Sequence, residues 1–323
     1  TGGRPVCAEL LGTAITCDGY HETAPSPEGI ARCVALAHER AGVRPQDIDF
    51  VMAHGTGTRL NDPTEARMLS AIFAGASPFV SAIKGATGHT SGASMLMSLI
   101  VALVMMRWRL VPPVVGLHDP LDEALGLRFP PNGGAPLNDG NAVIAQVESF
   151  GFGGVNSVCV VLSRERRGGR VGMRRAPGPG MARVLGVFVY EPGAPDTATG
   201  ALMPDPDNAR DWLGRRGLLG KNRATRMALC AAHGLTILRG AEAPPGDRTG
   251  VVVSSNFSNT DVVIRDANRL YREGEAALSP VEAPTHSANI IGSSLAIRYK
   301  WRGPNVSVCS GRRAGAEALE IAS

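Results

Sequence analysis

The residues best suited to chemistry in this chain are two histidines and one lysine that follow strand-like runs. His54 comes directly after the apolar run 48–53, Lys84 follows a similar run, and His89 lies five residues further along. Two neutral imidazoles can donate N–H groups to one developing oxyanion without bringing a full charge. A nearby ammonium can orient a carboxylate or a bound water. A lone histidine after a strand is more often structural, but the three side chains together are suited to stabilise a thioester enolate.

Composition excludes several other classes of function. The 323 residues are 44% hydrophobic, and the net charge is only +4, which fits a globular protein with room for two domains. No basic run alternates with aromatic residues, so we expect no nucleic-acid partner. The longest apolar run, 95–106, is too short to cross a bilayer and is expected to be a core helix. With no secretory signal at Thr1, the expected location is cytoplasmic.

Neither a metal nor a bound cofactor is expected from the sequence. The six cysteines are widely spaced, with no C-x-x-C pair and no histidine at metal-ligand spacing. They are typical of small buried hydrophobic residues in a reducing compartment. Leu60 occupies the last glycine position of a dinucleotide-binding loop, and Asn222 interrupts a phosphate loop.

A connector rich in Arg, Gly and Pro divides the chain. Residues 1–165 form the first block, 166–181 the linker and 182–323 the second block. Strands alternate with helices in both blocks, which is typical of an α/β layered fold. The predicted strands cover 48–53, 79–83, 142–148, 155–162, 183–190, 250–255 and 304–308. The predicted helices cover 29–41, 63–73 with Asp62 as N-cap, 90–107 with Thr90 or Ser91 as cap, 221–239, 259–273 and 313–322.

Four motifs in a fixed order carry a resemblance to a known family. They are H-G-T-G-T at 54–58, N-D-P-x-E at 61–65, K-G-x-x-G-H at 84–89 and S-F-G-F-G-G-x-N at 149–156. The whole first block, from about Cys17 onward, resembles the C-terminal half of a β-ketoacyl synthase, the decarboxylative condensing enzyme of fatty acid and polyketide assembly. The resemblance implies the thiolase-like fold, a five-layer α-β-α-β-α sandwich built from two similar halves.

The resemblance also assigns roles to five side chains. It implies that His54 and His89 are the catalytic histidines, that Lys84 is the catalytic-site lysine, and that Phe150 and Phe152 are gating aromatics beside an acyl pocket. One departure concerns the lysine. The family usually has a glutamate nine residues past the second histidine, in contact with the lysine, and this chain has Ser98 there.

The second block resembles the N-terminal half of the same family, just ahead of its nucleophile. Counting from Gly303-Pro304-Asn305 places the nucleophilic cysteine position at Arg312. Arginine cannot form a thioester, so this block resembles the chain-length-factor partner of heterodimeric polyketide synthases and is expected to be inactive by itself. Cys309 is a competing nucleophile, but its place three residues upstream, on the strand approach, favours a buried structural thiol.

The two halves stand in inverted order, with the C-terminal-like half first. By the family resemblance they also lack a connecting segment on the order of 80 residues, about half a domain. Three explanations remain: a window on a tandem synthase–partner fusion, a rearranged pair of half-folds, or an incomplete record of a longer protein. We favour the fusion, because the region around Met173 and Met181 resembles the junction between two consecutive units.

These observations lead to three hypotheses. The first is an acyltransferase that extends a chain with malonyl units delivered by acyl carrier protein on phosphopantetheine, as a ketosynthase/chain-length-factor pair in a homo- or heterodimer. The second is a catalytically inactive scaffold or chain-length subunit that needs a cysteine-bearing partner. The third is a thiolase-type enzyme with a second cysteine as base, which the two-histidine pattern disfavours.

Overall fold

The chain forms two compact units, each with its own core. The computed structural model describes residues 7–137, 142–163, 188–196, 200–235, 244–255, 257 and 259–322. The described residues of unit 1 lie within Thr1–Thr16, Ala24–Gly151 and Asn156–Met173, and those of unit 2 within Cys17–Thr23, Phe152–Val155 and Arg174–Ser323. The predicted linker and residues 183–187 of a predicted strand lie outside the described residues. The domain boundaries therefore stay a prediction.

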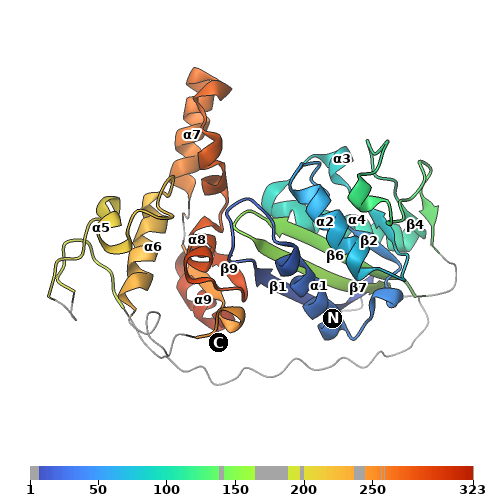
Figure 1. Ribbon diagram of the computed structural model, residues 1–323, viewed down its shortest axis with the longest axis horizontal. Coiled ribbons are helices and arrows are strands. Elements are labelled where there is room, and N and C mark those ends of the chain that lie inside the picture. Colours follow the sequence, from blue (N-terminus) through green and yellow to red (C-terminus); the bar gives the residue numbers. More distant parts are fainter. Residues whose placement is uncertain are drawn as a thin grey trace. The chain divides into compact units, whose positions relative to one another are not determined.

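A five-stranded sheet in the order β1-β7-β6-β2-β3 forms the centre of unit 1 (Figure 1). Its strands are β1 (Ala8–Cys17), β2 (Phe50–Met52), β3 (Phe79–Ser81), β6 (Ile144–Gly151) and β7 (Val155–Ser163). Strand β2 pairs in parallel with both β6 and β3. Two further short strands, β4 (Leu110–Val111) and β5 (Ala135–Pro136), pair in antiparallel. The predicted strands of the first block are confirmed, whereas β1 has no counterpart among them.

Helices cover both faces of this sheet, because the central strands are apolar on both sides. The helices are α1 (Pro27–Ala41), α2 (Asn61–Ile72), the short α3 (Lys84–Thr87) and α4 (Ser94–Trp108). Successive side chains of a strand point to opposite faces. Val51 accordingly packs in one core cluster with residues of α1 and α2. Its neighbours Phe50 and Met52 pack in another with residues of α4. This two-sided burial fixes the register of β2 and hence where its last residues emerge.

Two predicted helix caps are wrong. Asp62 lies inside the first turn of α2, where its carboxylate accepts the N–H groups of Thr56 and Gly57. The carboxylate of Asp62 therefore accepts N–H groups of the preceding loop and does not cap the helix. For α4, the 3₁₀ turn η2 (Ser91–Ala93) precedes the helix, and Thr90 makes no side-chain cap hydrogen bond there.

Helix α4 is more exposed than the sequence predicts. The segment Ser91–Trp108, which extends beyond the run 95–106 at both ends, is long and apolar enough for a membrane span by length and composition alone. Ala102 and Met106 are nevertheless buried against the sheet, as in the core helix of a globular domain. The opposite face is exposed at Leu96 and Ile100. Only one stripe of α4 is therefore core in unit 1.

Unit 2 combines the helices labelled α5 to α9 in Figure 1 with a two-stranded parallel sheet of β8 and β9. Its elements are α5 (Arg210–Leu213), α6 (Arg223–Gly234), β8 (Val251–Ser254), α7 (Thr260–Glu273), α8 (Ile290–Tyr299), β9 (Asn305–Val308) and α9 (Ala314–Ala322). The side chain of Asn222 caps α6 by accepting the N–H of Thr225. The predicted elements at 250–255, 259–273, 304–308 and 313–322 are confirmed. Helix α6 confirms the predicted helix over Arg223–Gly234, and residues 236–239 of that prediction lie outside the described residues. Helices α5 and α8 have no predicted counterpart.

Burial separates the six cysteines into two groups. Four are buried: Cys17, Cys33, Cys159 and Cys230. Burial raises the pKa of Cys33 and of Cys159 to about 11, so both are inert thiols at neutral pH. Cys7 and Cys309 are exposed. The prediction of a buried Cys309 is therefore wrong, because the chain leaves the core after β9.

Candidate active site

The parallel pairing of β2 and β3 brings His54 and Lys84 together. Met52, at the end of β2, lies opposite Ser81, at the end of β3. His54 follows β2 by two residues, and Lys84 follows β3 by three residues as the first residue of α3. His89 follows α3 directly after Gly88, which has φ 71°. Because the carboxyl ends of parallel strands share one edge of a sheet, both loops emerge side by side.

Three of the predicted catalytic side chains lie in contact. The rings of His54 and His89 have their centroids 5.5 Å apart and are nearly perpendicular, at 86°. Lys84 Nζ lies 3.3 Å from His54 Nδ1 and also donates to the backbone carbonyl of His54. His54 and Lys84 are buried, whereas His89 is exposed. The cluster therefore begins in the protein interior and ends at the surface of unit 1.

The neighbours of each imidazole select one tautomer. Lys84 is a donor without acceptor capacity, so His54 Nδ1 must accept from it and the ring proton is on Nε2. His89 Nδ1 accepts the backbone N–H of Ser91 at 3.0 Å, which places that proton on Nε2 as well. Ser91 takes the left-handed backbone, with φ 51°, to present this N–H. Two Nε2–H donors from separate loops result.

Electrostatics keep both histidines neutral. Burial, followed by the charge of Lys84, lowers the pKa of His54 to about 3. The same two causes lower the pKa of His89. Burial also lowers the pKa of Lys84, but the carboxylates of Glu65 and Asp62 raise it and so favour the ammonium form. The arrangement offers neutral N–H donors beside one cation, which suits an oxyanion that forms during reaction.

Ser98 does not take over the role of the glutamate that the resemblance leads one to expect. Its side chain is buried, and its hydroxyl has no hydrogen-bond partner among the described residues. Lys84 is held instead by His54, through both the ring and the main chain. The lysine thus has a fixed position without a carboxylate in direct contact.

Two acidic residues of α2 hold the loop that carries His54, and their role was missed in the sequence. Glu65 accepts the backbone N–H groups of His54 and Gly55, at 2.6 and 2.9 Å. Asp62 accepts those of Thr56 and Gly57. Four consecutive loop amides are therefore paired with two carboxylates. The close spacing of the motif N-D-P-x-E after H-G-T-G-T could have indicated that these two carboxylates bind the amides of the loop.

The two predicted gating aromatics differ in their surroundings. Phe150, at the end of β6, is buried, and its ring centroid lies 5.7 Å from that of His54. Phe152 is 47% exposed and belongs to unit 2, where its carbonyl accepts from Asn289. The structure therefore brings Phe150 to the histidines within unit 1. The gating role of both stays a prediction.

A small cavity opens beside the His54 loop in unit 1. It has a volume of about 150 Å³ and a mostly apolar wall that includes Gly55, Leu121 and Phe129. The residues that line it, all within the described part of the chain, include none of the two histidines and the lysine. This cavity is therefore next to the candidate site and is not formed by it.

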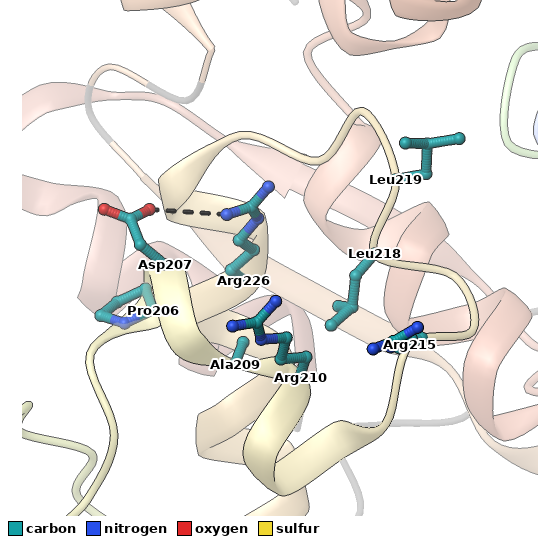
Figure 2. Close-up of a pocket in the computed structure, with 8 residues that line it drawn as sticks. All are labelled: Pro206, Asp207, Ala209, Arg210, Arg215, Leu218, Leu219 and Arg226. Carbon is teal, nitrogen blue, oxygen red and sulfur yellow. Dashed lines mark ion pairs between the residues drawn. The ribbon is translucent and has the colours of Figure 1, made fainter.

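A second cavity, of about 300 Å³, lies in unit 2 and is lined by three arginines and Asp207 (Figure 2). Arg226 pairs with Asp207 at 3.5 Å, and Arg210 lies 3.8 Å from the carboxylate of Asp211. Nearby carboxylates therefore offset part of its positive charge. None of the residues that the sequence singles out lines this cavity.

The predicted nucleophile position lies at the start of α9. Arg312 is exposed in the 3₁₀ turn η9 (Gly311–Arg313), which leads from β9 into that helix. Cys309 is exposed just before this turn. Among the described residues, no group of three or more histidines, cysteines or carboxylates is arranged to hold a metal ion.

Comparison with known proteins connects this geometry to a family. Residues 7–118 match the family described as "Beta-ketoacyl synthase, C-terminal domain". Unit 1 resembles a ketosynthase C-terminal half. The 3-oxoacyl-[acyl-carrier-protein] synthase 2 of Coxiella burnetii is 35% identical over 164 residues, covering 49% of this chain and 38% of that protein. Synthase 1 of Escherichia coli K12 is 32% identical over 159 residues, covering 49% of this chain and 37% of the relative. The chain thus spans under two fifths of the length of these relatives.

A solved structure resembles the whole chain. The structure described as "PfaC Keto synthase-Chain length factor" has a TM-score of 0.67 and 17% identity, and covers 99% of this chain and 42% of that chain. Identity this low shows the fold alone. The α/β, thiolase-like fold that the sequence predicts is confirmed, and so is the resemblance to the condensing enzymes.

Proposed function

We propose that unit 1 carries the decarboxylating part of a β-ketoacyl-[acyl-carrier-protein] synthase-type condensing site, and so belongs to an acyltransferase of fatty acid or polyketide elongation. The observation that supports this most is the pair of imidazoles 5.5 Å apart, both with Nδ1 engaged and Nε2 protonated. No described residue accepts from either Nε2–H. A substrate oxygen can therefore take both donors.

The chemistry uses each group in one role. The bond between the malonyl carboxylate and its α-carbon breaks, CO₂ leaves, and the electron pair moves onto the thioester as an enolate. His54 and His89 donate to the enolate oxygen, and Lys84 supports decarboxylation from beside them. The enolate carbon then attacks an acyl thioester, forming the new carbon–carbon bond and releasing the thiolate that carried the acyl group. Phe150 and Phe152 would gate access to this space.

The partner and location follow from the same proposal. Malonyl and acyl groups would arrive on the phosphopantetheine of an acyl carrier protein in the cytoplasm, and a ketosynthase-like subunit would complete a homo- or heterodimer. The acylated cysteine would come from a different ketosynthase unit, because Arg312 occupies the matching position in unit 2. Unit 2 would then be inactive by itself and act as a chain-length-factor-like partner.

The direct test is decarboxylation of malonyl-acyl carrier protein, measured as CO₂ release by the chain with its cysteine-bearing partner. Removal of one oxyanion donor costs roughly 10²–10³ in rate, so His54→Ala and His89→Ala should each fall by about that factor. The exposed His118 of the same unit provides the matched control His118→Ala, which should keep the full rate. Unchanged rates in both catalytic variants would refute the proposal.

A second candidate function is a scaffold without chemistry of its own, and Arg312 favours it. In that case the chain acquires no acyl group when incubated alone with acyl-carrier substrates. Peptide mass spectrometry after the incubation tests where the nucleophile position lies. An acyl adduct on Cys309 would show that the nucleophile lies there and that the position assigned to Arg312 is wrong.

A further inference from the structure

A row of buried polar side chains runs through unit 1 to the loop that carries His54. His38 on α1 contacts Gln146 on β6, Gln146 contacts Glu148 on the same strand, and the carboxyl group of Glu148 interacts with that of Glu65 on α2. Gln146 and Glu148 are completely buried, and Glu65 is 3% exposed. Two carboxyl groups in one dry core are costly unless their charges are reduced.

The known donors fix the direction of hydrogen bonding at both ends. Gln146 donates from Nε2 to Glu148 Oε1 at 2.6 Å, while its own oxygen faces His38 Nε2. Glu65 Oε1 accepts the N–H of His54, and Oε2 accepts from the N–H of Gly55 and from Asn61 Nδ2. Both oxygens of Glu65 are thus committed as acceptors. Three donors to its two oxygens stabilise the charged form, which favours Glu65 as the carboxylate of the pair.

Glu148 Oε2 is the atom that remains without a donor. It is buried and has no N–H or O–H donor as a partner among the residues that the structure describes, and the neighbouring carboxyl group of Glu65 accepts from its other contacts. Two acceptors in contact are satisfied when one of them carries a hydrogen. A proton on Glu148 Oε2 completes the row, with every donor directed toward Glu65.

We propose that Glu148 is a protonated positioning residue, whose carboxyl O–H holds Glu65 in place as the acceptor of the His54 and Gly55 amides. The effect on the reaction rests on the proposed function, because it requires that His54 be catalytic; the protonation of Glu148 does not. Glu148 does not touch the reacting atoms. It acts through Glu65 on the backbone at the end of β2, and so on the direction of the His54 ring.

The charges around the pair agree with a single proton. Burial and the negative charge of Glu65 raise the pKa of Glu148 well above the usual glutamate value. Burial raises the pKa of Glu65 too, but its amide donors oppose that shift. The one remaining negative charge acts with Asp62 to favour the ammonium of Lys84, which burial alone would disfavour.

The other ionisable groups near the pair contribute little charge. On α1 these are His38, whose pKa burial lowers so that it is neutral, and the buried thiol Cys33, whose pKa is raised to about 11. Arg32 on the same helix acts on Cys33 as a cation. His54 is neutral at the other end of the row. Lys84 and Asp62 are therefore the main charged groups that affect the ionisation of Glu65 and Glu148.

Two glutamine variants test the assignment, because they exchange one carboxyl each for an amide of the same size. Glu148→Gln keeps a donor toward Glu65 and an acceptor toward Gln146, so it should fold and retain the decarboxylation rate within about threefold. Glu65→Gln places an N–H against the amide of His54 or of Gly55. A mispaired group of this kind costs roughly 1–3 kcal/mol, which corresponds to at least a fivefold lower rate.

Two readouts do not depend on catalysis, so they separate this inference from the proposed function. Isotope-edited infrared spectra of the whole chain at pH 7 should show the C=O band of one protonated carboxylic acid, absent in Glu148→Gln. Glu148 in the unfolded chain loses its proton above pH 4.5, whereas the folded chain keeps it. The unfolding equilibrium constant of the wild type relative to Glu148→Gln should therefore rise about tenfold per pH unit from that value up to the pKa of Glu148 in the folded chain, and level off above it.

Each outcome decides the question. An acid band that disappears in Glu148→Gln, together with the pH dependence of relative stability, supports the assignment even if no decarboxylation is found. An ionised Glu148 at pH 7, or a Glu148→Gln variant as damaged as Glu65→Gln, would overturn it.

Discussion

Replacing Lys84 by methionine removes the charge next to His54 while keeping an unbranched side chain of similar length. Lys84 is 8% exposed, so methionine suits its surroundings. The structure gives the ammonium two effects on His54. It holds Nδ1 as an acceptor at 3.3 Å, and it lowers the pKa of the ring. The Lys84→Met variant should alter both the pH profile and the rate at neutral pH.

The expected change in the pH profile follows from the causes that lower the pKa of His54, taken in order of size. The pKa of His54 lies at about 3 instead of 6.5, with burial as the largest cause and Lys84 as the second. Removing the second cause raises the pKa of His54, while burial, the largest cause, still holds it below 6.5. The acid limb of the rate profile, where His54 becomes charged, should therefore move up and stay below pH 6.5.

At pH 7 His54 is neutral in both proteins, so any loss there comes from the ring's freedom to change tautomer and from the missing ammonium. Hydrogen bonds to charged groups contribute about 1.5–3 kcal/mol, which corresponds to roughly 10–150-fold in rate. The assay is malonyl decarboxylation from about pH 2.5 to pH 9, a range that includes the acid limb of the wild type, with Lys300→Met as the matched control in unit 2. A variant with the wild-type rate at pH 7 and an unmoved acid limb would refute the role given to Lys84.

The remaining predictions concern the loop backbone and the thiols. A Cβ on Gly55, which has φ 42°, would lie 2.6 Å from Ala82 Cβ, whereas one on Gly57, with φ 73°, meets nothing within 4 Å. Gly55→Ala should thus lower the free energy of unfolding by about 1–3 kcal/mol, and by clearly more than Gly57→Ala in urea denaturation; equal losses would contradict the packing. Under native conditions a maleimide should label Cys7 and Cys309 rapidly and spare the four buried cysteines, and protection of Cys309 would show that its exposure is wrong.

The sequence predicts strands well where a continuous apolar run ends at a polar residue. The run before His54 and the run before Lys84 both form strands, and their parallel pairing follows from burial on both faces. Strand β1 was missed because Ala8–Cys17 mixes small, polar and apolar residues, with burial that follows no strict alternation. Helix α8 was missed because Ile290–Tyr299 combines glycine and serine with β-branched residues.

The supports of the site were harder to find than its reactive residues. Motif spacing indicates His54, Lys84 and His89, since each follows a strand or a glycine turn. The roles of Glu65 and Glu148 arise only when the fold brings these two carboxyl groups together from α2 and β6, which no local pattern encodes. One signal was present: Glu148 stands within a strand whose neighbours are almost all buried, where an unpaired charge is rare. Asp62 was predicted to cap the helix because the sequence does not show that backbone N–H groups of the preceding loop bind its carboxylate instead.

The claim on which the account depends is that two neutral imidazoles present Nε2–H groups to one oxyanion. Long-range ¹H–¹⁵N NMR spectra of histidine-labelled protein at pH 7, recorded before and after addition of a non-hydrolysable malonyl-pantetheine analogue, measure this directly. The account predicts that His54 and His89 are both neutral, both protonated at Nε2, and both shifted together by the analogue. A charged ring, a proton on Nδ1 of either histidine, or a response from only one ring would contradict it.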